Sequence, residues 1–288
     1  MIIQKLFSFF DGKIIDFNLE FYLKFNRSFR FGDGIFETIR VQNGELLFFN
    51  DHISRFKKGI SLLKFEIDIQ NIKKNVENEI RKIILENNII NSKIRIQLFR
   101  DGEGLYIPEK NNALLLIEFL PLPNDYTFFD IDKKIIVGIS KESFVSNTIF
   151  SGLKTCNALP YIIAGVEKKS RNEDELIILN DKGFISECIA SNIFWIEQNE
   201  IYTPALSCAC LEGVMRKNII NIFDSNDIEV NEVKQNFSLI KLNEAIFFTS
   251  NVFGIKIISK IEDFYTLAEK NFKEFKKTKA FELLQSFN

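Results

Sequence analysis

The sequence predicts two domains of the α+β or α/β class, and three observations support this fold class. Alternating apolar residues, typical of strands, occur between segments with apolar residues at helical spacing, on both sides of residue 120. Residues 121–125, PLPND, interrupt this pattern as a linker does. A chain of 288 residues is long enough for one large domain or two ordinary ones. We therefore expect a small N-terminal domain (1–120), a linker (121–125) and a larger C-terminal domain (126–288), with the chemistry at their junction.

The N-terminal segment predicts a small sheet covered by two helices. Asn43-Gly44 favours a two-residue hairpin turn between strands at 36–41 and 46–49. Asn50 or Asp51 can cap a first helix, whose apolar positions are 53, 56, 60 and 63. A second helix is expected over 69–85, with positions 72, 76, 80 and 83 facing inward. Strands follow at 93–100 and at 113–120, and the continuous apolar character of the latter predicts a central strand.

The C-terminal segment predicts a second, mixed α+β unit. A helix is expected from the segment after residue 154 to about 168, another over 213–223, and a charged amphipathic helix at the end of the chain. The expected strands are 134–140, 175–180, 184–188, 192–197, 245–248 and 255–259. A turn is expected at 198–200.

Composition excludes several classes of function. The formal net charge is −2, so a surface that attracts nucleic acid or an anionic membrane is not expected. The chain has no apolar run long enough to cross a bilayer, and its N-terminus does not resemble a signal peptide, so we expect a cytoplasmic protein. Its four cysteines do not have the spacing of a zinc site, and the single histidine, His52, is far from them in sequence. We therefore expect reduced thiols and no metal.

Two charged residues lie in otherwise uncharged segments, Lys154 in 151–159 and Glu187 in 184–194. A low-dielectric environment favours a neutral amine, which can form an imine, whereas a buried carboxylate needs a cationic partner. A protonated pyridine nitrogen is such a partner, so the two residues indicate pyridoxal 5'-phosphate (PLP). Most lysines and glutamates are solvated surface charges, however, and spacing alone gives Lys154 only a slight advantage over other lysines.

Two further positions could bind an anion. Gly213 precedes an expected helix, and the backbone amides at such an end suit a phosphate, although many helices begin this way for structural reasons. Arg55 on the first expected helix carries the right charge, with an ordinary exposed arginine as the alternative.

Taken in order, these segments resemble the class IV aminotransferase family, the fold-type-IV PLP enzymes, from about Phe29 to Ile258. The segments that carry the resemblance are FGDGIFETIRV (31–41), DHISRF (51–56), GLKTCNAL (152–159), DELIILNDKGFISECIASNIFWI (174–196), IYTP (201–204), LEGVMR (211–216) and FFTSNVFGI (247–255). The family includes branched-chain aminotransferases, D-amino-acid aminotransferase and aminodeoxychorismate lyase. The resemblance implies a two-domain, D-amino-acid aminotransferase-like fold, PLP at the domain junction, and a homodimer.

The resemblance also implies roles for individual residues. Lys154 would bind the cofactor aldehyde and move the proton, and Glu187 would keep the ring nitrogen protonated. The other residues implied to bind the cofactor or order its site are Arg55, Asn192, Val214, Met215 and Ser250.

Four positions separate the branches of the family. Leu159 occupies a position where branched-chain aminotransferases place a tyrosine, and Phe36 one where the D-amino-acid enzyme has a substrate-binding tyrosine. Several lyases carry a phenylalanine at the position of Phe36 and a threonine two positions later, as Thr38 is here, and the lyases tolerate a methionine at the position of Met215. The resemblance therefore implies that Phe36 lies beside the substrate and Thr38 beside the leaving oxygen. Arg100 resembles a residue that holds the substrate carboxylate in some members, with a surface arginine at a strand end as the alternative.

The lyase resemblance implies a small-molecule amino substrate, 4-amino-4-deoxychorismate, converted to 4-aminobenzoate and pyruvate in folate precursor synthesis. An aminotransferase acting on branched-chain L-amino acids or on D-amino acids is the alternative within the family. A catalytically silent binding or scaffold protein is the alternative outside it, and the presence of Lys154, Glu187 and Arg55 argues against that role.

Overall fold

The computed structural model describes residues 3–8, 14–15, 26–122, 128–129, 135–197, 200–239, 246–251, 254–262, 264–265 and 269–287. Residues 123–125 of the expected linker lie outside these ranges, as do positions 134, 198, 199 and 245 at the ends of expected elements. The chain divides into two compact units: unit 1 comprises Met1–Tyr126 and Leu153–Asn157, and unit 2 comprises Thr127–Gly152 and Ala158–Asn288. The division into domains at a single linker, expected from the sequence, stays a prediction.

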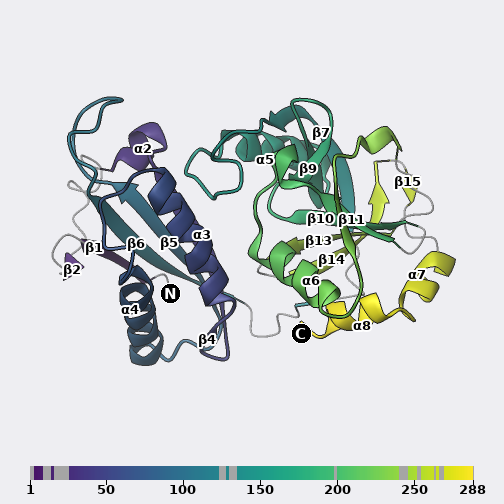
Figure 1. The fold of residues 1–288 in the computed structure, drawn as a ribbon, viewed down its shortest axis with the longest axis horizontal. Helices are drawn as coiled ribbons and strands as arrows, with labels where there is room; N and C mark the ends of the chain where they lie inside the picture. The colour runs from purple at the N-terminus through teal and green to yellow at the C-terminus, as the bar shows by residue number, and fades with distance from the viewer. Residues whose placement is uncertain are drawn as a thin grey trace. The chain divides into compact units, whose positions relative to one another are not determined.

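Unit 1 contains a six-stranded antiparallel sheet in the order β2-β1-β6-β5-β3-β4, with two long helices on one face (Figure 1). Its elements are β1 (Ile3–Ser8), β2 (Ile14–Ile15), α2 (Arg27–Phe31), β3 (Gly34–Gln42), β4 (Glu45–Leu46), α3 (Phe49–Leu62), α4 (Ile72–Glu86), β5 (Ser92–Arg100) and β6 (Ala113–Pro121). Strand β6 lies between β1 and β5, which confirms the central position predicted from its apolar run.

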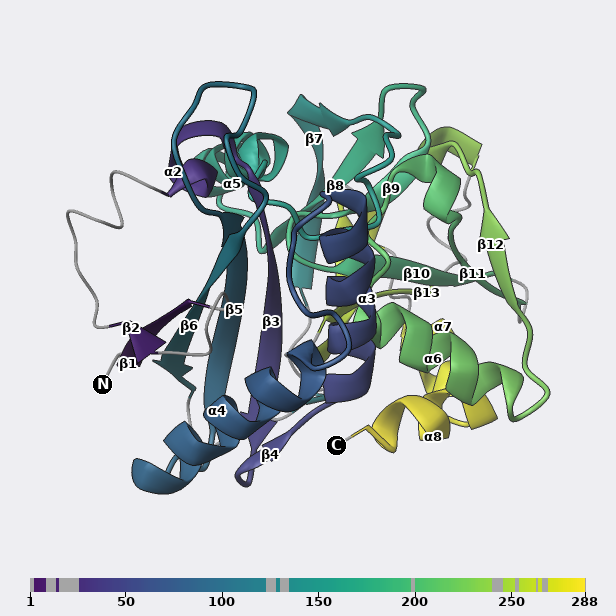
Figure 2. The same cartoon turned by 60° about the vertical axis from the view of Figure 1, so that its left-hand side comes forward.

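The core of unit 1 forms where α3 and α4 cover the sheet (Figure 2). The inward positions predicted for α4 are all buried, and those of α3 are buried except for position 63, which follows the helix. Asn43 and Gly44 both have positive φ, as the predicted hairpin turn requires. The expected start of the first helix was wrong: β4 ends at Leu46, and Phe48, with a φ of 53°, precedes α3 in place of Asn50 or Asp51.

Unit 2 contains a nine-stranded mixed sheet in the order β12-β11-β10-β13-β14-β7-β8-β9, with β15 paired to β14. Its strands are β7 (Ile135–Val145), β8 (Glu175–Asn180), β9 (Ile185–Cys188), β10 (Asn192–Glu197), β11 (Glu200–Pro204), β12 (Val230–Val233), β13 (Ile246–Asn251), β14 (Gly254–Ile261) and β15 (Phe264–Tyr265). Its helices are α5 (Leu159–Arg171), α6 (Val214–Asp224), α7 (Glu269–Phe275) and α8 (Lys279–Gln285), with short 3-10 turns at Leu206–Cys208 and Phe237–Leu239.

Helix α5 packs on β7 and β8, and helix α6 packs on β12, β13 and α8. Aromatic side chains pack against one another across the neighbouring strands β10 and β13. The rings of Phe194 and Phe248 stack with centroids 5.0 Å apart, and Trp195 is buried beside Phe247. Strands β8 and β10 begin and end where the sequence predicts, whereas β11 and β12 were not predicted as strands, because they are short and carry polar residues.

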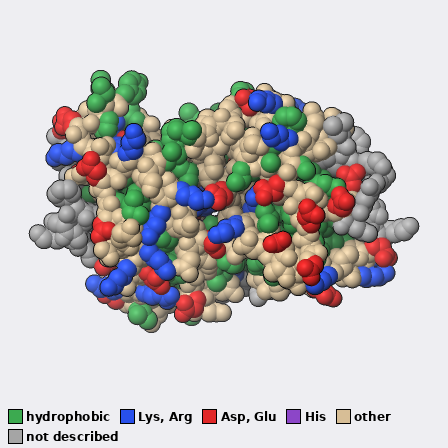
Figure 3. Space-filling model, viewed as in Figure 1, with side chains coloured by type: hydrophobic (Ala, Val, Ile, Leu, Met, Phe, Trp, Pro, Cys, Tyr) green, Lys and Arg blue, Asp and Glu red, His purple; other side chains and the backbone are tan. Residues whose placement is uncertain are grey.

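Acidic and basic side chains are interspersed over the face shown in Figure 3, in line with the small net charge. Across the described residues, no helix has both the length and the apolar character needed to cross a membrane.

Candidate functional site

In unit 1, the segment that carries Lys154 lies along the first residues of β3. The backbone N–H of Phe36 donates to the carbonyl of Lys154 (2.8 Å), and the N–H of Cys156 donates to the carbonyl of Gly34 (2.9 Å). A Cβ at Gly34 would lie 2.9 Å from the carbonyl oxygen of Leu98 and 3.1 Å from Cys156 Sγ. Only glycine therefore lets β3 pass this closely between β5 and the lysine segment.

The side chain of Phe36 lies beside two cationic groups. The Nζ of Lys154 is 5.2 Å from the centre of the Phe36 ring, and the guanidinium carbon of Arg95 is 3.9 Å from it. Strand alternation places Thr38 on the same face of β3 as Phe36, directly opposite Arg95 on β5. The Arg95 side chain is about one-third exposed and contacts Gln97 (3.0 Å). This face presents an aromatic ring, an amine and a guanidinium together.

The opposite face of β3 carries a buried charged cluster of Glu37, His52 and Arg55. Glu37 accepts two hydrogen bonds from Arg55, from Nε to Oε1 (2.7 Å) and from Nη2 to Oε2 (2.6 Å). His52 Nδ1 lies 2.7 Å from Glu37 Oε2. All three side chains are at most 5% exposed. Arg55 is therefore not the exposed arginine considered as an alternative: a carboxylate holds its guanidinium rigidly.

The charges of this cluster follow from its contacts. Burial raises the pKa of Glu37, but the charge of Arg55 and the hydrogen bonds from Arg55 and His52 outweigh burial and bring the pKa to about 2. Burial lowers the pKa of His52, the bond to Glu37 opposes this, and the positive charges of Arg55 and Lys154 lower it further. His52 is therefore neutral at pH 7, and the Arg55–Glu37 pair has no net charge.

Arg100 lies in a separate network at the end of β5. Its Nε donates to Asp33 (3.0 Å), Nη1 to Asn111 Oδ1 (2.7 Å) and Nη2 to the carbonyl of Leu63 (2.7 Å). Arg27 donates to the same carboxylate of Asp33 at 2.9 Å. Because each guanidinium nitrogen of Arg100 is used to join segments of unit 1 and the residue is 6% exposed, the geometry favours a structural role over carboxylate binding.

In unit 2, Glu187 lies in β9, with every residue of the strand buried. The hydroxyl of Tyr161 on α5 donates to Oε1 (2.7 Å), and the backbone N–H of Leu211 donates to Oε2 (3.1 Å). Glu187 itself is 3% exposed. This is the buried carboxylate expected from the sequence, supported by two hydrogen-bond donors within its own unit.

The backbone of Leu211 also contacts Asn192: the side-chain Nδ2 of Asn192 donates a hydrogen bond to the carbonyl of Leu211 (3.0 Å). Two residues later, Gly213 precedes α6, which begins without a side-chain cap. A Cβ at Gly213 would lie 1.8 Å from Asn192 Oδ1, so this position has no room for another residue. Asn192 and Glu187 thus hold the same turn, which leads to the first helical residues, Val214 and Met215.

Ser250 lies opposite Asn192 in the pairing of β10 with β13. Its hydroxyl is buried and has no hydrogen-bond partner among the described residues, which is unusual for a native interior. An uncapped helix N-terminus and an unpaired hydroxyl are groups that bind a phosphate, and a buried carboxylate suits a protonated pyridine. By their chemistry, these groups of unit 2 fit the phosphate and the ring nitrogen of PLP, and the amine of Lys154 in unit 1 fits its aldehyde.

Gly213→Ala tests the importance of this turn. The added methyl group must displace the Asn192 amide and break its bond to Leu211, so we expect the free energy of unfolding to fall by about 1–3 kcal/mol and PLP to bind more weakly. Thermal unfolding and PLP titration of the apoprotein measure both. Gly165→Ala in α5 is the matched control, because its methyl group meets nothing within 4 Å and is expected to stabilise the helix by about 0.4–1 kcal/mol. Equal stabilities of the two variants would contradict this account.

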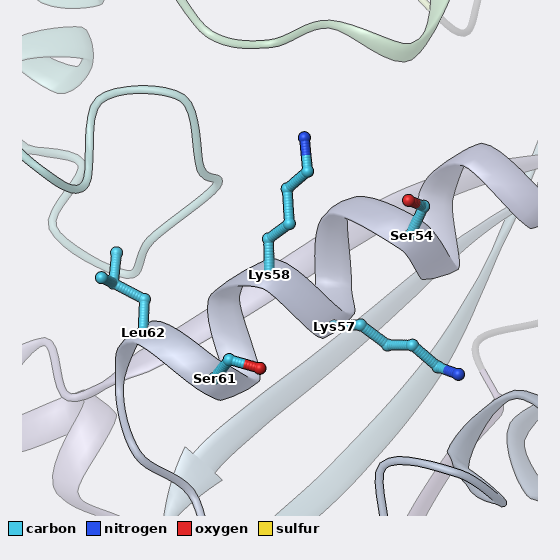
Figure 4. A pocket seen from close by; sticks show the side chains of 5 residues that line it. All are labelled: Ser54, Lys57, Lys58, Ser61 and Leu62. Carbon is cyan, nitrogen blue, oxygen red and sulfur yellow. The ribbon is translucent and has the colours of Figure 1, made fainter.

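A shallow, open hollow lies on the side of α3 that faces away from the core of unit 1. Ser54, Lys57, Lys58, Ser61 and Leu62 line it, and Figure 4 shows the two lysine side chains extending in different directions. The two ammonium groups do not converge on one point, so this hollow is not a candidate for the site. Among the described residues, no group of three or more His, Cys, Asp or Glu side chains is arranged to hold a metal ion.

Glu37, Arg95 and Tyr161 were not predicted as site residues from the sequence. Glu37 was recognisable in principle, because it alternates with Ile35 and Ile39 on the core face of a strand and therefore needs a buried partner. Arg95 alternates with apolar residues on β5, as an ordinary outward-facing arginine does, and nothing in the spacing of Tyr161 indicated a contact with Glu187.

Comparisons with known proteins agree on one family. A family model described as amino-transferase class IV matches residues 34–261. A D-alanine aminotransferase of Listeria monocytogenes is 26% identical over 253 residues, covering 82% of this chain and 81% of that protein. An aminodeoxychorismate lyase of Vibrio harveyi is 22% identical over 238 residues, covering 82% and 86%. The crystal structure of a branched-chain aminotransferase from Thermoproteus uzoniensis superposes with a TM-score of 0.79 at 21% identity, covering 98% and 93% of the two chains.

Proposed function

The chain belongs to the class IV aminotransferase family, which makes it a PLP-dependent enzyme with the fold-type-IV fold expected from its sequence, and from this premise we propose that it is a lyase. Its proposed reaction converts 4-amino-4-deoxychorismate to 4-aminobenzoate and pyruvate. One observation carries this choice: the Phe36 ring lies against both Lys154 and Arg95. A flat ring beside a guanidinium suits a cyclic carboxylate substrate.

The proposed cofactor contacts follow the chemistry of each side chain. Lys154 binds the aldehyde, and Glu187 pairs with the ring nitrogen. The phosphate is bound by Arg55, by the backbone amides of Val214 and Met215, and by the Ser250 hydroxyl. Asn192 positions the turn before α6. When bound, PLP supplies a carbon that holds the substrate's amino group and a ring that accepts electrons from the bond being broken.

The chain's own residues would then carry the proton. The amine of Lys154 removes the hydrogen from the substrate ring carbon that bears the amino group. The bond from the adjacent ring carbon to the enolpyruvyl oxygen breaks, the ring becomes aromatic, and the leaving group takes up one proton to become pyruvate. Thr38 is proposed to assist the leaving oxygen, because it lies on the same strand face as Phe36 and opposite Arg95.

An aminotransferase acting on D-amino acids or branched-chain L-amino acids is the second candidate. It would use the same cofactor residues, and Arg95 would also suit an amino-acid carboxylate. The relatives include proteins named D-alanine aminotransferase and branched-chain aminotransferase, which is what favours this candidate.

A product assay separates the two candidates. With aminodeoxychorismate, the lyase is expected to release equal amounts of pyruvate and 4-aminobenzoate without an added keto acid. With a panel of L- and D-amino acids, an aminotransferase instead converts its cofactor to the pyridoxamine form, which absorbance reports. No product from aminodeoxychorismate, together with pyridoxamine formation from an amino acid, would reject the lyase.

Replacing Arg95 and Arg100 in turn tests which arginine binds substrate. We expect Arg95→Leu to raise KM for a carboxylate substrate about 10- to 100-fold, because a charge-assisted hydrogen bond is lost. Arg100→Leu is expected to lower Tm, with little change in KM for the protein that remains folded, because its partners are Asp33, Asn111 and Leu63. Steady-state kinetics and thermal unfolding distinguish the two, and a reversal of these effects would restore Arg100 as the substrate-binding residue.

We also propose a homodimer. Several apolar side chains of unit 2 are strongly exposed, with Leu159 at 71%, Ile162 at 55% and Val166 at 62% along one helix, and Ile149 at 73% nearby in sequence. Sedimentation should give twice the 33.5 kDa mass of one chain.

A cytoplasmic location is proposed in line with the four free cysteines. A role in folate precursor synthesis follows from 4-aminobenzoate as the proposed product.

A further inference from the structure

The Tyr161 hydroxyl donates a hydrogen bond to the Glu187 carboxylate. Tyr161 lies in the first turn of α5, and its ring packs against an apolar cluster that includes Val145, Ala164 and Ile178. From there its hydroxyl reaches Glu187 Oε1 at 2.7 Å. Because the ring is fixed by packing, the donor is held in place independently of any ligand.

We propose that Tyr161 is a positioning residue that keeps the Glu187 carboxylate ionised and oriented toward the ring nitrogen of PLP. This proposal rests on the proposed role of Glu187 and deepens it. A hydrogen bond to a carboxylate favours its charged form and reduces its affinity for a proton. The shared proton therefore stays on the ring nitrogen, where it sustains the electron-accepting character of the cofactor.

The direction of this hydrogen bond is constant. Burial, together with the charge of Glu187 and the bond to it, raises the pKa of the Tyr161 hydroxyl, so the group remains protonated over the pH range of an enzyme. The Leu211 amide, which donates to the other carboxylate oxygen, has no alternative protonation state. Glu187 thus faces two permanent donors in unit 2, and both favour the anion.

Tyr161→Phe removes the hydroxyl and keeps the ring that packs in the cluster. The readout is the affinity of the apoprotein for PLP and for 1-deaza-PLP, in which a carbon replaces the ring nitrogen. We expect Tyr161→Phe to weaken PLP binding about 10-fold, the loss typical of one hydrogen bond to a charged group, and to leave 1-deaza-PLP binding unchanged. Equal weakening of both ligands, or no weakening of either, would overturn the proposal.

A second measurement uses the loaded protein. With ¹⁵N-labelled PLP, the ring-nitrogen resonance of the wild type is expected at the protonated position and that of Tyr161→Phe shifted toward the unprotonated one. An unchanged resonance would overturn the proposal. Tyr202→Phe is the matched control, because its hydroxyl also donates to a glutamate, Glu200, but at the surface, so neither affinity nor resonance should change.

The same experiment separates this proposal from the function it rests on. If the wild type binds PLP and 1-deaza-PLP equally well, Glu187 does not pair with the ring nitrogen, and the proposed cofactor role of Glu187 fails. If the wild type prefers PLP and Tyr161→Phe keeps that preference in full, the role of Glu187 stands and only the role of Tyr161 fails.

Discussion

Replacing Lys154 with alanine is expected to lower kcat by about 10⁴-fold, because the substitution removes both the amine that binds the cofactor and the base that moves the substrate proton. The backbone of the segment should keep its conformation, because hydrogen bonds from the backbone amides of Phe36 and Cys156 join it to β3. The small size of Gly34, which allows this close approach, is also unchanged. The loss should therefore appear in catalysis and not in Tm.

Borohydride reduction followed by peptide mapping provides the direct measurement. In the wild type, the reduced cofactor is expected on the peptide that contains Lys154, and in Lys154→Ala on none. Lys57→Ala is the matched control: this lysine, also in unit 1, lies on the outer side of α3 and should be dispensable for both labelling and activity. Labelling of another lysine in the wild type would remove the basis of the proposed mechanism.

The parts of the fold that follow from periodicity were predictable. The four inward positions of α4 and the bounds of β8 and β10 were identified because an apolar stripe or alternation has no other low-energy arrangement. The strands β11 and β12 were missed because their few polar residues are held in the sheet by neighbours distant in sequence. The same holds for Phe48, whose left-handed backbone conformation no local preference indicates.

For the candidate site, the sequence indicated which charged residues take part but not the neighbouring groups that hold them in place. Lys154 and Glu187 were singled out because burying a charge within an apolar segment costs free energy unless the charge has a partner. The donors that surround Glu187 come from α5 and from the turn before α6, 26 and 24 residues away along the chain, so no local pattern contains them. The close packing at Gly213, before α6, likewise depends on the side chain of Asn192, which comes from strand β10.

Glu37→Gln is expected to destabilise the apoprotein by about 3–5 kcal/mol at pH 7, because the substitution leaves the buried guanidinium of Arg55 without its counter-charge. Chemical denaturation measures the loss. Glu77→Gln is the matched control: Glu77 also pairs with an arginine, Arg81, but the pair is exposed on α4, so we expect a change of at most about 0.5 kcal/mol. A comparable loss in both variants would mean that burial of the Glu37 cluster contributes nothing.

The pH dependence of stability gives an independent check on the same residue. The pKa of Glu37 lies at about 2 in the folded protein and at an ordinary 4.5 otherwise, so its contribution is complete above pH 4.5 and is lost as pH falls toward 2. A difference of this size corresponds to about 3 kcal/mol. The wild type should lose that much more stability than Glu37→Gln between pH 5 and 2, and parallel profiles would contradict the pairing. Because the substitution leaves Arg55 with uncompensated charge, inorganic phosphate should also stabilise Glu37→Gln more than the wild type, if Arg55 binds the cofactor phosphate as proposed.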